Sequence, residues 1–170
     1  MSAAALSALD EARFGLRIAK ASPADAAEWD AARAYCARHE VRLLIARIDA
    51  AHLALAQRME RDGARLTDVL LQYRASRARR PAVAAGDRVR VRACAPREAE
   101  RIGDLARQCF RNYASHYRAD ARLDPAACDE VYADWARRAC AERAVADTVL
   151  VAERAGEWLG FAALRLLEPV

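Results

Sequence analysis

The chain has 170 residues, enough for one medium domain or two small ones, and its 55% hydrophobic and 31% charged residues exclude a disordered or fibrous protein. Its net charge of +4 is small for a nucleic-acid-binding protein, because 24 acidic residues offset 28 basic ones. Nine arginines fall between Arg74 and Arg101, but no aromatic residues for base stacking are interleaved with them. We therefore expect no nucleic-acid partner, and polyanion binding by this stretch is the weakest alternative.

Five cysteines are spread along the chain: Cys36, Cys94, Cys109, Cys128 and Cys140. They form no C-x-x-C pair, and no histidine lies at metal-ligand spacing from them, so we expect reduced thiols, no metal site and a cytoplasmic location. The first twenty residues carry Asp10 and Glu11 and lack the sustained apolar core of a signal peptide. The longest apolar run is too short to span a membrane, and no membrane partner is expected.

Residues 1–74 predict a small α/β domain. Its first ten residues are alanine-rich and favour a frayed helix or a tail. The elements expected next are a strand at Phe14–Lys20, a helix from Pro23 that fades near His39, a strand at Val41–Ile48, a helix capped by Asp49 that runs through Glu60, and a strand at Leu66–Tyr73. Ser22 is the expected cap of the first helix, and Gly63 the left-handed residue after the second. This alternation predicts an open, mostly parallel sheet.

Residues 75–87 lose all periodicity and carry Pro81 and Gly86, which indicates a linker between two domains. The elements expected in residues 88–170 are a half-exposed strand around Val89 and Val91, a helix from Pro96, a helix from Pro125, and strands at Thr148–Glu153 and Trp158–Leu167. A tight hairpin over residues 154–157 joins the last two strands. The second half is therefore strand, helix, loop, helix, strand, strand.

That order of elements resembles the beginning of a GNAT N-acetyltransferase domain. VRVRACAPREAERIGDLARQCF is similar to the family's first strand and helix, LDPAACDEVYADWARRAC to its second helix, and TVLVAERAGEWLGFAALRL to its second and third strands. The loop HYRADARLDP followed by VYADW resembles the dTDP-fucosamine acetyltransferase group, whose N-terminal strands resemble RFGLRIAKA, VRLLIARIDA and DGARLTDVLLQYR. The resemblance implies an α/β fold, in which a small, partly GNAT-like domain precedes the N-terminal half of a GNAT domain with a mixed sheet.

The resemblance also implies an acyltransferase that moves an acetyl group from acetyl-CoA to a small-molecule amine, such as an amino-sugar nucleotide. In that family an R/Q-x-x-G-x-G/A turn at a helix N-terminus binds the pyrophosphate. No such turn occurs in the 170 residues, so we expect a chain truncated before the acetyl-CoA motif and inactive by itself, with catalytic and cofactor-binding residues unknown. The alternative is a non-catalytic GNAT-like scaffold or dimerisation module, which forms a homo-oligomer through the edge strand Trp158–Leu167.

An irregular segment between the two later helices holds the candidate substrate-binding residues: Arg111, Tyr113, His116, Tyr117, Arg118 and Arg122. Functional residues tend to lie on loops held by a rigid scaffold, and the resemblance implies that this loop approaches the acceptor. Arginine can bind a phosphate with two donors, and tyrosine can stack on a base or a sugar. His116 could act as a base, although the spacing identifies no partner carboxylate. A polar loop whose aromatic residues pack on the core is an equal alternative.

Overall fold

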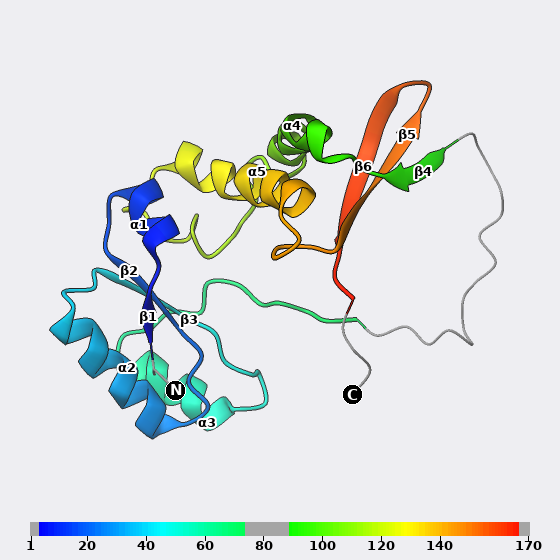
Figure 1. The fold of residues 1–170 in the computed structure, drawn as a ribbon. Helices are drawn as coiled ribbons and strands as arrows, with labels where there is room; N and C mark the ends of the chain where they lie inside the picture. The colour runs from blue at the N-terminus through cyan, green and yellow to red at the C-terminus, as the bar shows by residue number, and fades with distance from the viewer. Residues whose placement is uncertain (1–3, 74–88, 167–170) are drawn as a thin grey trace. The chain divides into compact units, whose positions relative to one another are not determined.

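The computed structural model describes residues 4–73 and 89–166, so the predicted linker at 75–87 lies outside the described residues. The chain divides into two compact units. The first unit comprises Met1–Val69 and Ala114–Asp124, and the second comprises Leu70–Tyr113 and Pro125–Val170. Each unit combines helices with one three-stranded sheet in its described part, so the expected α/β fold is confirmed (Figure 1).

The elements of the first unit are β1 (Ala5–Leu6), α1 (Ala8–Phe14), β2 (Ile18–Ala21), α2 (Ala26–Arg38), β3 (Leu43–Ala46) and α3 (Leu53–Arg61). The strand order is β1-β2-β3. β2 pairs in parallel with β3, with Ile18 opposite Leu43, whereas β1 pairs antiparallel with β2. The expected parallel pair is therefore present, but the sheet is mixed and small, not mostly parallel.

Several boundaries in the first unit differ from the prediction, for local reasons. Gly15 ends α1 in the left-handed conformation with φ of 61°, so the strand predicted from Phe14 begins only at Ile18. Asp25, not Ser22, caps α2, because its carboxylate accepts a hydrogen bond of 2.8 Å from the N–H of Glu28. Similarly, His52 and not Asp49 occupies the N-cap position of α3, three residues later than predicted.

The segment Leu66–Tyr73 forms no strand, so that prediction was wrong. Its apolar side chains are exposed, from 63% at Val69 to 77% at Leu66, and Tyr73 is still more exposed. The prediction was based on the apolar composition of the segment, but in the structure these side chains are exposed and pack on no sheet. Gly63, in contrast, has φ of 94° just after α3, as the sequence indicated.

In the described part of the first unit, two small clusters of buried apolar residues lie beside Ile18 and Ala19 of β2, which are also fully buried. Three alanines, Ala4, Ala21 and Ala32, form one of them. The other joins Trp29 of α2 to Leu55 and Met59 of α3, and these two helices lie side by side in Figure 1. Such small clusters bury little apolar surface, so polar contacts contribute a larger share of the stability of this unit.

The elements of the second unit are β4 (Arg90–Ala93), the short 3-10 helix η2 (Pro96–Glu98), α4 (Ala99–Cys109), α5 (Pro125–Ala141), β5 (Thr148–Arg154) and β6 (Glu157–Leu164). The strands lie in the order β4-β5-β6, and both pairs are antiparallel. Ala155 and Gly156 have φ of 50° and 84°, as a two-residue hairpin requires at both central positions. The predicted order of elements in this half is confirmed.

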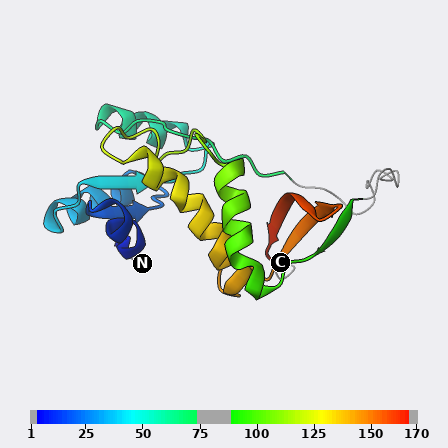
Figure 2. The same cartoon turned by 90° about the horizontal axis from the view of Figure 1, so that it is seen from above.

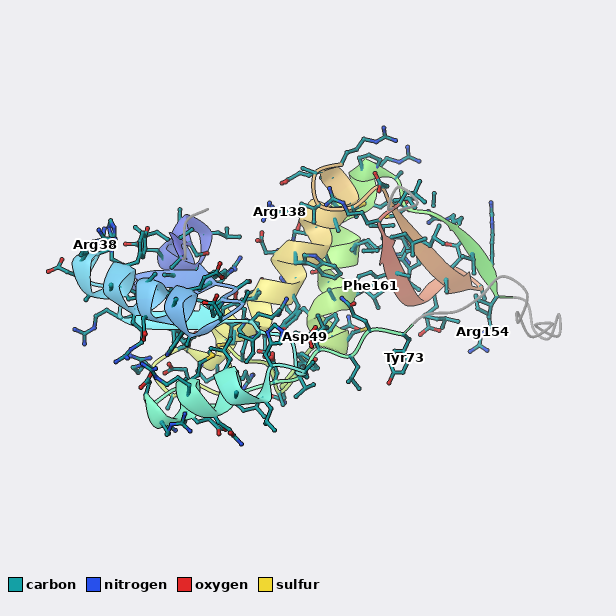
Figure 3. The ribbon with its side chains drawn as sticks, turned by 90° about the horizontal axis from the view of Figure 1, so that it is seen from below. Arg38, Asp49, Tyr73, Arg138, Arg154 and Phe161 are labelled. Atoms are coloured by element: carbon teal, nitrogen blue, oxygen red, sulfur yellow. The ribbon has the colours of Figure 1, made fainter. Side chains whose placement is uncertain are left out.

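The two helices of the second unit pack together and on one face of its sheet (Figure 2). The buried core draws on every one of these elements except β4: Ile102, Ala106, Ala136, Ala139, Val149, Val151 and Trp158, with Ala146 from the α5–β5 connection. Figure 3 labels Phe161 on β6 near these helices, where its ring lies 6.3 Å from that of Trp135. Of the helices in the described ranges, none has both the length and the apolarity needed to cross a bilayer.

Candidate functional site

The six predicted substrate-binding residues fall in both units. Arg111 and Tyr113 belong to the second unit, at the C-terminal end of α4. The segment Ala114–Asp124 carries the other four and belongs to the first unit, where it packs with residues from the start of the chain. The segment that was expected to serve the GNAT-like half is therefore partly a structural component of the N-terminal unit.

Tyr117 belongs to a buried polar group around Asp10, which is only 1% exposed. The Asp10 carboxylate accepts hydrogen bonds from Ser7 Oγ at 2.7 Å and from the Tyr117 hydroxyl at 3.1 Å. Lys20 Nζ forms an ion pair with it at 2.6 Å. Tyr117 is 5% exposed, and its ring lies 5.4 Å from that of Phe14. We call these four polar residues (Ser7, Asp10, Lys20 and Tyr117) the Asp10 cluster.

The ionisation of the Asp10 cluster is set by burial and by its ion pair. Burial acts to raise the pKa of Asp10, but hydrogen bonds from Lys20 and Ser7 outweigh it, so the pKa lies below its usual value. Burial likewise acts to lower the pKa of Lys20, yet the bond to Asp10 leaves it raised. Burial, with the nearby Asp10 charge, raises the pKa of Tyr117. None of these shifts creates a base or nucleophile near neutral pH, so the cluster is built for stability.

His116 has a carboxylate partner that its sequence spacing did not reveal. Its Nδ1 lies 2.8 Å from Asp68 Oδ2, and its backbone N–H donates to the same oxygen at 3.1 Å. Burial acts to raise the pKa of Asp68, but these hydrogen bonds from His116 leave it lowered. A carboxylate at Nδ1 orients the imidazole and leaves Nε2 as the nitrogen available for proton transfer. Because 48 residues separate the two, no spacing rule could have paired them.

Of the two remaining arginines in this segment, Arg122 has a local structural role. Arg122 donates to Asp120 at 2.5 and 2.9 Å and to the Arg42 carbonyl oxygen at 2.9 Å. These bonds from Arg122 lower the pKa of Asp120 to about 2. Arg118 is half-buried, and its backbone N–H donates to Ser115 Oγ at 3.4 Å. Arg122 therefore has fewer donors for a substrate phosphate than the sequence suggested.

The second unit presents a different group at the end of α4. Phe110 stacks on Tyr132 of α5 with ring centroids 4.7 Å apart, and Tyr113 meets both rings edge-on at 5.7 and 5.4 Å. Asn112 turns the chain here with φ of 59°. Tyr113 is 49% exposed and Arg111 is exposed, so this pair combines an accessible aromatic edge with an accessible guanidinium.

The first unit also has a shallow pocket of about 320 Å³, which the sequence did not indicate. Its lining residues are Trp29, Arg33, Cys36, Leu44, Asp62, Gly63 and Ala64. Asp62 accepts from Trp29 Nε1 at 2.8 Å and from Arg58 Nε at 2.9 Å, and it pairs with Arg33 at 3.3 Å. Its charge is thus already compensated, and burial raises the pKa of the Cys36 thiol, which makes that thiol a poor nucleophile.

Comparison of the chain with protein-family models and with curated proteins gives no match. Within residues 4–73 and 89–166, no three His, Cys, Asp or Glu side chains gather as a metal site would require. A functional assignment therefore depends on the fold of the second unit and on the accessible groups described above.

Proposed function

We propose that the second unit is the N-terminal portion of a GNAT-type domain that transfers an acetyl group from acetyl-CoA to a small-molecule amine. One observation supports this most: the unit has the order strand, helix, helix, strand, strand that the sequence resemblance implies. Its strands make one antiparallel sheet in the order β4-β5-β6, and α4 and α5 cover one face of that sheet.

The accessible residues suggest where the acceptor would bind. Among the six candidates, Tyr117 is buried and Arg122 is bonded to Asp120, whereas Arg111 and Tyr113 are exposed at the end of α4. An exposed guanidinium and an exposed aromatic ring two residues apart in the sequence suit an acceptor with a phosphate and a ring, as an amino-sugar nucleotide has. We therefore assign the acceptor contacts to Arg111 and Tyr113, which both belong to the second unit.

Acetyl-CoA itself requires residues that this sequence does not supply. The R/Q-x-x-G-x-G/A turn that would bind the pyrophosphate is absent from the 170 residues. Among the described strands, β6 pairs only with β5, so its other edge is where a following strand of the sheet would add. The reaction would join the amine nitrogen to the acetyl carbon as the thiolate of coenzyme A leaves, and the proton lost from the amine would pass to that thiolate.

The test of this proposal compares two lengths of the protein. The coding sequence after Val170 is read first, and we expect it to encode the R/Q-x-x-G-x-G/A turn in frame. The longer protein should then bind acetyl-CoA in calorimetry and release thiol with an amino-sugar nucleotide, while residues 1–170 alone should do neither. Acetyl-CoA binding by residues 1–170 would contradict the assignment, and so would a longer protein that fails to bind it.

The edge of β6 favours a second candidate function, a non-catalytic dimerisation module. Leu159 and Leu164 on this strand are 40% and 41% exposed, and an apolar edge strand invites pairing with a second copy. Sedimentation of the 18.7 kDa chain distinguishes the two candidates, because a stable dimer without acetyl-CoA binding in the longer protein would favour the scaffold. Sedimentation as a monomer would contradict the dimerisation module.

A further inference from the structure

Two of the five cysteines lie in direct contact in the second unit. Cys94 immediately follows β4, and Cys140 lies in the last turn of α5. Their Sγ atoms are 3.2 Å apart, although 46 residues separate them in the sequence. The Cys140 thiol also lies 3.3 Å from the carbonyl oxygen of Ala95.

The two thiols are held by regular structure, so their proximity belongs to the fold. The N–H of Cys94 donates to the Val149 carbonyl oxygen at 2.8 Å, which continues the pairing of β4 with β5. Cys140 is fixed by the helix that carries it, and both residues pack at the border of the apolar core. A disulfide requires its sulfur atoms at about 2.05 Å, so an approach of about 1.2 Å is needed, which small side-chain rotations can supply.

We propose that Cys94 and Cys140 are a redox modification site, which a peroxide converts to an intramolecular disulfide and a thiol reductant restores. Both side chains are half-buried, so a small oxidant such as hydrogen peroxide can reach them. Burial, reinforced by Cys140, raises the pKa of Cys94 to about 12, so the Cys94 thiol stays protonated near neutral pH.

The oxidation is balanced with hydrogen peroxide as the only co-reactant. The Cys140 sulfur attacks one peroxide oxygen, the O–O bond breaks, and a sulfenic acid and one water form. The Cys94 sulfur then attacks the sulfenic sulfur, its proton passes to the departing hydroxide, and a second water leaves. Two thiols lose two electrons in total, and peroxide is reduced to two waters.

The disulfide would connect the end of β4 to the end of α5 around a long chain segment. Cross-linking a loop of this size restricts the unfolded chain, and the second unit should become more resistant to unfolding. We expect the thermal midpoint of this unit to rise by roughly 5 to 15 °C on oxidation and to return on reduction.

The test uses the full 170-residue chain treated with a small excess of hydrogen peroxide. Thiol titration in denaturant should fall from five thiols to three, since the chain has five cysteines. Trypsin cleavage without reductant should release Ala93–Arg97 joined to Ala139–Arg143, as seen by mass spectrometry. Dithiothreitol should separate the two peptides and lower the midpoint again.

Two variants provide the controls. Cys140→Ser should abolish the linked peptide and the rise in midpoint, whereas Cys109→Ser, which changes an exposed cysteine, should keep both. The peptide map of the unsubstituted chain does not depend on either variant folding well. Three results would overturn the proposal: Cys94 and Cys140 stay reduced, they are oxidised to sulfinic acids without linkage, or the only disulfides join separate molecules through Cys109.

Discussion

The two units differ in what occupies their interiors. The first unit has small apolar clusters and a buried charge at Asp10, to which Tyr117 attaches the segment Ala114–Asp124. The second unit is organised around one contiguous apolar cluster that includes Ile102 and Val151, both fully buried. The stability of the first unit should therefore depend on ionisation, and that of the second on side-chain volume.

The largest effect is expected from Ile102→Ala in the second unit. The substitution leaves a cavity among α4, α5 and β5, and it should lower the free energy of unfolding by about 3 kcal/mol. Amides of α4 and β5 should lose protection in hydrogen exchange.

Val91→Thr is the matched control, because Val91 is 61% exposed on β4 and the replacement keeps a branched side chain. Its effect should stay within about 0.5 kcal/mol. A loss below about 1 kcal/mol for Ile102→Ala would break the comparison, since it would show that the apolar cluster does not carry the stability of this unit.

The second expected effect is that of Asp10→Asn in the first unit. The substitution keeps the shape but removes the charge that Lys20 pairs with, and about 2 kcal/mol should be lost at pH 7. Lys20 remains about half exposed and can turn to water, which limits the loss. Glu11→Gln is the control, because Glu11 is 40% exposed and its ion pair with Arg17 spans 3.5 Å.

The pH dependence of this effect follows from the direction of the pKa shift. The pKa of Asp10 is lower in the folded chain than its usual value, so its stabilising contribution is present above about pH 4, near the pKa of an unperturbed aspartate. It is lost as the pH falls through the folded value. Denaturation midpoints of the two proteins should therefore differ most at pH 6–7 and converge below pH 4. A difference that does not shrink at all as the pH falls from 7 to 2 would contradict an electrostatic origin.

The sequence predicted the second unit better than the first, and the reason is physical. Strong local signals define its elements: Pro96 and Pro125 start helices, and Ala155-Gly156 allows a tight turn. The run Leu66–Tyr73, which crosses the boundary between the two units, has the composition of a strand, yet no strand in the described ranges pairs with it. Pairing is a property of the whole sheet, and it is not encoded in one segment.

Contacts between distant segments were also what the sequence could not predict at the candidate site. The sequence located the segment that carries Tyr117 and His116 but not their partners, because Asp10 and Asp68 lie 107 and 48 residues away. The equal alternative, a loop whose aromatic residues pack on the core, describes Tyr117 as the structure shows it. The contact of Cys94 with Cys140 could likewise not be predicted from the sequence, because the two sulfurs meet only when α5 packs near the end of β4.

The smallest effect on the free energy of unfolding is expected from Tyr117→Phe. This variant tests whether the Asp10 cluster holds the segment Ala114–Asp124 in place. The variant keeps the ring against Phe14 and removes only the hydroxyl that donates to Asp10 at 3.1 Å. Asp10 keeps its bonds to Lys20 and Ser7, so the loss should be about 1 kcal/mol.

Amide hydrogen exchange is the decisive measurement, because it detects local opening of this segment. The midpoint of global unfolding is much less sensitive to such local opening. The amide of Ala119, which donates to the Ser115 carbonyl oxygen at 3.1 Å, should exchange about fivefold faster in Tyr117→Phe, the rate change that corresponds to about 1 kcal/mol. Tyr113→Phe, at a half-exposed ring of the second unit, should leave that rate unchanged. If both variants leave the exchange rate of Ala119 unchanged, apolar packing of the Tyr117 ring holds the segment in place. The polar contribution to the first unit would then rest on the ion pair between Asp10 and Lys20.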